Sequence, residues 1–85
     1  MARAPGRSIT EAVELFYEIA DAASAEARKL VMASGRKDEV KFRNLYYPEV
    51  RADFTARGGT RPPALWDGRE LHQGLDAIRA AIGAY

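Results

Sequence analysis

The sequence predicts an α/β domain in the order β-α-β-α-β-β-α, with a four-stranded mixed sheet and helices on both of its faces. Runs of β-branched, aromatic and aliphatic residues alternate along the chain with stretches of strong helix formers, as is typical of α/β domains. The first two predicted strands are separated by a helix, so they should be parallel with a right-handed crossover. The last two are separated only by a tight turn, so they should form an antiparallel hairpin.

Length and charge exclude several classes of protein. The chain has 85 residues, of which 47% are hydrophobic, as expected for one small globular domain rather than a disordered segment. Its 13 basic and 12 acidic residues nearly cancel to a net charge of +1, so the basic face of a nucleic-acid binder is not expected. No apolar run approaches the ~18 residues of a membrane span. We therefore expect a cytoplasmic protein that contacts neither nucleic acid nor membrane.

The N-terminal part of the chain predicts a leader, a central strand and a capped helix. Residues 1–10 are small, basic and polar and predict a flexible leader, which a single domain over residues 11–85 follows. Residues 12–19 (AVELFYEI) form a near-continuous apolar run, which is typical of a central strand covered on both faces. Asp21 suits the N-cap of a helix, and the helix formers of residues 22–34 come directly after it.

The middle of the chain predicts an edge strand and a second helix. Residues 40–47 (VKFRNLYY) alternate apolar side chains with Lys and Arg, and charged side chains of this kind are common on edge strands. Pro48 suits the first turn of a helix over residues 49–57. The glycine pair at 58–59 ends that helix.

The C-terminal part predicts a hairpin and a last helix. Two prolines cannot donate to a strand ladder, so the third strand is limited to residues 64–66. The Asp67-Gly68 pair is a strong hairpin-turn signal, and residues 69–72 are then the return strand. Gly74 ends that strand, and a helix over residues 75–84 places its apolar stripe against the sheet.

The first predicted strand-to-helix junction resembles the redox site of the glutaredoxins, a family of the thioredoxin fold. In VELFYEIADAASAEARKL, a strand leads into a helix that carries Ala-Arg and then an apolar pair, as in that family. This match puts Asp21 and Ser24 at the two positions where the family carries two cysteines, or a cysteine and a serine. The chain itself contains no cysteine. The N-terminal domains of glutathione transferases share the same layout.

Three further segments carry the same resemblance, which covers residues 12–83. The segment TRPPALWDG is similar to the Thr-Val-Pro segment of the family. It puts Pro62 at the position of the family's cis-proline, with the Asp67-Gly68 turn at the matching distance. The segment HQGLDAI is similar to the Gly-Gly-x-Asp segment that opens the last helix of the family, with Gly74 and Asp76 matching. The resemblance therefore implies a thioredoxin-like fold.

The resemblance also implies a groove beside Pro62 for an extended peptide such as glutathione. In the family, the cis bond exposes the backbone of the preceding residue, here Arg61, to such a peptide. The start of the last helix holds the γ-glutamyl end of glutathione, and an arginine suits its glycyl carboxylate. A tyrosine near the junction serves a bound ligand in the transferases. The candidate groove residues are therefore Tyr17, Arg57, Arg61, Pro62, Gly74, Leu75 and Asp76.

Three residues disfavour glutathione as the ligand. Glu18 stands where glutaredoxins usually carry a basic residue, and Gln73 replaces a glycine of the family pattern. Asp21 places a negative charge where the thiolate of a bound glutathione would sit, and like charges repel. No cofactor is therefore expected, and glutathione stays an alternative ligand.

Thiol–disulfide exchange is excluded because the reaction needs a cysteine thiolate and the chain has no cysteine. A carboxylate at a helix N-terminus, as at Asp21, is well stabilised and poorly nucleophilic. The sequence identifies no base that would activate the hydroxyl of Ser24, so Ser24 is not expected to act as a nucleophile. We expect it to be a solvent-facing residue of the first helical turn. The alternative for Ser24 is a hydroxyl that hydrogen-bonds the thiolate of glutathione. Both residues are interpreted as vestigial active-site positions.

These expectations lead to a redox-inactive module that binds another protein or a peptide in the groove beside the cis-proline. The alternative is a glutathione-binding protein or a transferase-like enzyme that does not use a thiol of its own. A third hypothesis is an oxidoreductase that has lost its cysteines, which cysteines restored at positions 21 and 24 would test by reduction of hydroxyethyl disulfide. No metal site is expected, since His72 is the only histidine and has no cysteine partner.

Overall fold

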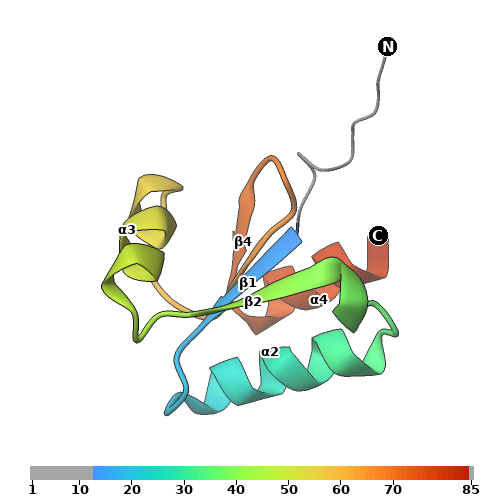
Figure 1. The fold of residues 1–85 in the computed structure, drawn as a ribbon. Helices are drawn as coiled ribbons and strands as arrows, with labels where there is room; N and C mark the ends of the chain where they lie inside the picture. The colour runs from blue at the N-terminus through green and yellow to red at the C-terminus, as the bar shows by residue number, and fades with distance from the viewer. Residues whose placement is uncertain (1–12, 85) are drawn as a thin grey trace.

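The computed structural model describes residues 13–84. For Ala84 it describes only the backbone. The predicted leader and residues 11, 12 and 85 lie outside this range. No helix in the described range is both long and apolar enough to cross a membrane. The helices and strands follow the predicted order (Figure 1). They are β1 (Val13–Tyr17), α2 (Ala22–Ala33), a 3-10 turn (Lys37–Glu39), β2 (Val40–Asn44), α3 (Pro48–Ala56), β3 (Ala64–Trp66), β4 (Leu71–Gln73) and α4 (Leu75–Ala84).

The strands form one four-stranded mixed sheet in the order β2-β1-β3-β4. β1 runs parallel to β2, with Leu15 opposite Phe42, and antiparallel to β3, with Leu15 opposite Leu65. β3 and β4 are antiparallel. The predicted α/β class, the mixed sheet, the central first strand and the edge position of the second strand are confirmed. This order and these directions are compatible with a thioredoxin-like layout.

One part of the core lies between the sheet and the helices α2 and α4. Figure 1 shows these two helices side by side, with α3 apart from them. α2 presents Ala27 and Val31, which are one helical turn apart, and α4 presents Ile78; all three are fully buried. The strand residues of this cluster are Val13, Leu15, Val40 and Leu65.

The other part of the core lies under α3, on the opposite face of the sheet. Pro48 occupies the first turn of α3, as predicted. The rings of Phe54 on α3 and Phe16 on β1 pack with their centroids 5.4 Å apart. A Cβ on Gly59 would lie 2.5 Å from the Phe54 ring, so this position needs glycine. The buried residues on this side are Phe16, Leu45, Val50, Phe54 and Ala64.

The hairpin between β3 and β4 differs from the predicted one. Trp66 pairs with Leu71, so the loop comprises residues 67–70 and the return strand begins at Leu71 rather than at residue 69. The side chain of Asp67 explains the longer loop. Its Oδ1 accepts the backbone N–H groups of Arg69 and Glu70 at 2.8 and 2.9 Å. This Asx-type turn keeps both residues out of the strand ladder.

The cis peptide bond lies one position beyond the prediction. It joins Pro62 to Pro63, whereas the resemblance placed it before Pro62. The prediction for Pro62 is therefore wrong, although the cis bond does fall within the predicted segment. Both prolines have the tertiary amide that makes a cis bond accessible, so the sequence does not select between them.

Candidate functional site

The β1–α2 junction has the capping geometry that the sequence predicts. Asp21 is the N-cap of α2 with extended backbone (φ −93°, ψ 128°), and its Oδ2 accepts the N–H of Ser24 at 2.7 Å. The carbonyl of Asp21 accepts the N–H of Ala25 at 3.0 Å. The carboxylate thus satisfies an N–H group that has no partner within the helix. The N-cap prediction for Asp21 is confirmed.

Ser24 does not face solvent, so that prediction is wrong. Its side chain is fully buried, and its Oγ accepts the backbone N–H of Glu18 at 3.1 Å. The hydroxyl therefore fixes the end of β1 against the start of α2. A ligand would have to displace this packing before it could contact the Ser24 hydroxyl.

Replacement of Ser24 by alanine is expected to lower the free energy of unfolding by about 1–2 kcal/mol. The reason is that the Glu18 N–H loses its acceptor inside the protein. Urea unfolding of the two proteins measures the difference, with Thr55→Ala on the exposed surface of α3 as the control that changes little. Equal unfolding midpoints for Ser24→Ala and wild type would contradict this role.

The side chain of Gln73 accepts hydrogen bonds from backbone N–H groups beside the proline pair. Its Oε1 accepts the N–H of Thr60 at 2.8 Å and the N–H of Arg61 at 3.0 Å. Its Nε2 donates to the carbonyl of Gly58 at 3.3 Å. Pro62 has no N–H at all. An extended peptide therefore finds no free backbone donor between Thr60 and Pro62 unless Gln73 moves away.

Arg61 and the start of α4 lie together, as the resemblance implied. The guanidinium of Arg61 packs against Gly74, with Nη2 3.0 Å from the point where a Cβ of Gly74 would be. Gly74 has a φ of +95°, a conformation that favours glycine. Asp76 is fully exposed in the first turn of α4, one residue after Leu75, and pairs with Arg79 at 3.3 Å.

Two of the predicted groove residues lie elsewhere. Arg57 packs on the face that α3 covers, with its guanidinium carbon 4.7 Å from the centroid of the Trp66 ring. Tyr17 packs on the other face, edge-on to Phe42 with their ring centroids 6.2 Å apart and under the guanidinium of Arg28. The predicted residues thus do not form one continuous groove.

An open cavity of about 270 Å³ lies where the parallel strands β1 and β2 end. Two turns build it. The Glu18 carbonyl accepts the N–H of Asp21 at 3.1 Å, which places Ile19 at the tip of the first turn. The Asn44 side chain accepts the N–H of Tyr46 at 2.9 Å in the second turn. The residues that line the cavity are Glu18, Ile19, Ala20, Asn44, Tyr46 and Arg51.

The walls of this cavity combine apolar surface with one ion pair. Ile19 is 61% exposed and Tyr46 is 78% exposed, and the ring of Tyr47, itself half exposed, packs edge-on against Tyr46. The carboxylate of Glu18 pairs with the guanidinium of Arg51 at 2.7 Å. The two charges offset each other, which leaves the apolar side chains as the main feature of the surface.

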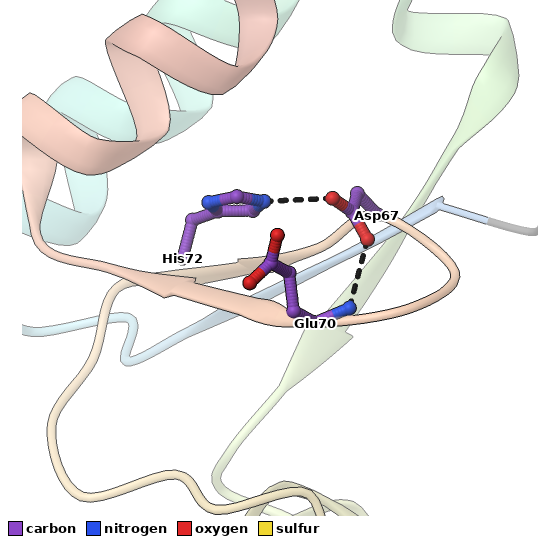
Figure 2. Close-up of side chains that lie close together, drawn as sticks. All are labelled: Asp67, Glu70 and His72. Atoms are coloured by element: carbon purple, nitrogen blue, oxygen red, sulfur yellow. Dashed lines mark hydrogen bonds and ion pairs between the residues drawn. The ribbon is translucent and has the colours of Figure 1, made fainter.

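A second group of polar side chains gathers at the hairpin loop (Figure 2). Nε2 of His72 on β4 lies 2.8 Å from Oδ2 of Asp67, which follows β3. Figure 2 shows the side chain of Glu70 turned toward this pair. Burial raises the pKa of Asp67, but hydrogen bonds from His72 and from the N–H groups of Glu70 and Arg69 outweigh it and lower this pKa from 3.8 to about 2.

The Asp67 carboxylate makes the stability of the fold depend on pH. The pKa of Asp67 is lower in the folded protein than in the unfolded chain. The ionised carboxylate therefore stabilises the fold at pH values above the unfolded pKa, and this contribution is lost as the pH falls. In metal-free buffer we expect wild type to lose about 1–2 kcal/mol between about pH 4 and pH 2 through this group. Asp67→Asn lacks this loss, so its unfolding free energy should converge with that of wild type at the acid end. Parallel curves of stability against pH would contradict the role of Asp67.

Comparison of the chain with protein-family models, with curated proteins and with solved structures found no match. The site therefore has to be interpreted from its own geometry. The sequence did not indicate Gln73 as the partner of the Thr60–Arg61 backbone, nor any residue that lines the cavity, including its exposed walls Ile19 and Tyr46. The signal available for these two walls was a large side chain in each turn, Ile19 directly before Ala20 and Tyr46 two residues after Asn44.

Proposed function

We propose that this protein is a redox-inactive, glutaredoxin-like domain of the thioredoxin fold that binds an extended segment of another protein. The observation that carries the proposal is the cavity at the ends of β1 and β2, whose walls include the largely exposed side chains of Ile19 and Tyr46. The chain has no cysteine, so thiol–disulfide oxidoreductase activity is not expected. Binding is the function that this end of the sheet supports best.

Exposed aromatic and aliphatic side chains that lie together favour a protein partner. Tyrosine is enriched in protein interfaces because it offers a large apolar area and a polar tip. Tyr46 and Tyr47 pack edge-to-face with centroids 5.3 Å apart, and Ile19 lines the same cavity as Tyr46. Ligands of open α/β sheets also bind near the carboxyl ends of the strands, where this cavity lies.

The edge strand and the paired charges at the cavity support an extended, uncharged segment as the occupant. β2 is an edge of the sheet and ends at Asn44, which lines the cavity, so an extended segment can pair with β2 and reach the cavity. Glu18 and Arg51, the charged lining residues, already pair with each other. The partner segment therefore inserts an uncharged aromatic or aliphatic side chain between Ile19 and Tyr46.

Selection from a phage-displayed library of random peptides tests this function. We expect the wild-type domain to enrich peptides that place an aromatic or aliphatic residue within a β-prone stretch. Tyr46→Asp should no longer retain them. Met32→Asp, a matched change at another exposed apolar side chain on α2, should retain them fully. Equal retention by Tyr46→Asp, or no enrichment on wild type, would contradict the proposal.

Glutathione is the second candidate because the Arg61 guanidinium lies beside Gly74 at the start of α4. A free carboxylate would suit this place. We nevertheless expect no saturable heat in titration calorimetry with glutathione at about 1 mM. The reason is that Gln73 occupies the N–H groups of Thr60 and Arg61. Saturable binding that Arg61→Ala abolishes would replace the first proposal with this one.

A further inference from the structure

The loop between β3 and β4 brings together three side chains that metal ions commonly use as ligands. Asp67 follows β3, Glu70 ends the loop and His72 lies in β4. One ligand atom from each lies within 4.8 Å of the others. Figure 2 shows the carboxylate of Glu70 turned toward the space beside the imidazole and the Asp67 carboxylate. We propose that Asp67, Glu70 and His72 form a binding site for a divalent transition-metal ion, with Zn²⁺ as the best fit. This site is separate from the cavity at the ends of β1 and β2.

The distance between the His72 and Asp67 ligand atoms approaches that between two ligands of one ion. Nε2 of His72 and Oδ2 of Asp67 are 2.8 Å apart. Zn²⁺ binds imidazole nitrogen and carboxylate oxygen at about 2.0–2.2 Å, which puts two ligands of one tetrahedral ion roughly 3.4 Å apart. A movement of about half an ångström therefore converts the hydrogen-bonded pair into a metal-bound pair. An ion bound to Nε2 takes the place of a proton on this atom, and the neutral imidazole then carries its proton on Nδ1.

The Asp67 carboxylate is held in position by its other oxygen. Oδ1 accepts the N–H groups of Arg69 and Glu70, which leaves Oδ2 directed at the imidazole of His72. His72 in turn is fixed in β4, where it pairs with Leu65 across the hairpin. Hydrogen bonds of this kind orient the ligands of metal sites and reduce the side-chain rearrangement that ion binding requires.

The donor set and its charge select the class of ion. Among the described residues, the carboxylate of Glu70 makes no hydrogen bond or ion pair, although it lies beside the carboxylate of Asp67. A divalent cation would neutralise both. The imidazole of His72 favours Zn²⁺ and similar transition ions over Mg²⁺ and Ca²⁺, which prefer oxygen ligands alone. The sequence predicted no metal site because His72 has no cysteine partner. The structure instead brings these two carboxylates close to its imidazole.

The test uses the single histidine of the chain as the reporter. Untagged protein is titrated with ZnCl₂ while the imidazole resonances of His72 are followed by NMR. We expect a saturable change with one ion per chain, which Mg²⁺ at the same concentration does not produce. Glu70→Gln, an exposed position that leaves the fold intact, should weaken Zn²⁺ binding about tenfold or more. His72→Ala should abolish the single-site binding in calorimetry.

The control is Asp76→Asn, which removes a fully exposed carboxylate outside the loop and should leave Zn²⁺ affinity unchanged. Thermal unfolding of each variant establishes that it is folded. The proposal is overturned if Zn²⁺ at about 1 mM leaves the His72 resonances unchanged. It is equally overturned if Glu70→Gln and His72→Ala bind Zn²⁺ as wild type does.

Discussion

Replacement of Glu14 by alanine is expected to lower the free energy of unfolding by about 3 kcal/mol. The Glu14 side chain is only 9% exposed and pairs with the guanidinium of Arg43 and with Nη1 of Arg57, the latter at 3.0 Å. Alanine leaves these two guanidinium groups, which are 17% and 26% exposed, without their shared counter-charge. A loss of this size is a large part of the total stability of a small domain. Urea unfolding followed by circular dichroism measures it.

The effect is large because the same charges connect α3 to the sheet. Nη2 of Arg43 on β2 donates to Asp53 of α3 at 2.9 Å. The guanidinium carbons of Arg43 and Arg57 lie 5.4 and 5.6 Å from the centroid of the buried Phe16 ring. Glu14 thus holds the two arginines between α3 and the strands, and its loss leaves both without that anchor.

The matched control for Glu14 is Glu26→Ala. Glu26 pairs with Lys29 on the exposed side of α2, where both side chains are more than half exposed, so the change should cost less than about 0.5 kcal/mol. Equal unfolding midpoints for Glu14→Ala and Glu26→Ala would show that the charges under α3 do not stabilise the fold.

The second large effect is on binding. Ile19→Asp and Tyr46→Asp should each weaken the binding of a peptide selected on the wild-type domain by about 30-fold or more. Each change puts a charge on the wall of the cavity, and that charge must lose water when the apolar side chain of the peptide enters. Fluorescence anisotropy of the labelled peptide measures the affinities.

Met32→Asp provides the control for this binding experiment. Met32 is 57% exposed on α2 and does not line the cavity, so the change alters surface charge and hydrophobicity to the same degree as Ile19→Asp. Its peptide affinity should stay within about twofold of wild type. A similar loss for all three variants would mean that the peptide responds to net charge and not to the cavity.

The order of the elements could be predicted from the sequence because local signals mark most boundaries. Asp21 caps α2, Pro48 starts α3 and Gly74 separates β4 from α4, as expected. The length of the hairpin loop could not be predicted in this way. It depends on the Asp67 side chain, which accepts two backbone N–H groups and so competes with the tight turn that Asp-Gly favours.

The site was less predictable because it depends on contacts between distant segments. Glu18 and Arg51 are far apart in the sequence, and the parallel pairing of β1 and β2 brings the turn after β1 close to α3, which carries Arg51. Gln73 likewise reaches Thr60 and Arg61 only because β4 folds back on β3. The resemblance implied that Arg61 and Gly74 share one groove but gave no indication that Gln73 accepts the N–H groups of Thr60 and Arg61.

Chemical-shift mapping tests most directly whether the protein binds through the cavity at the ends of β1 and β2 or beside the proline pair. The ¹⁵N-labelled domain is titrated with a peptide selected on the wild type, and the backbone amide shifts are followed. The largest changes are expected at Ile19, at Tyr46 and Arg51, and along the edge strand β2. Changes confined to Arg61 and residues 74–76, or no changes at saturating peptide, would contradict the proposed function.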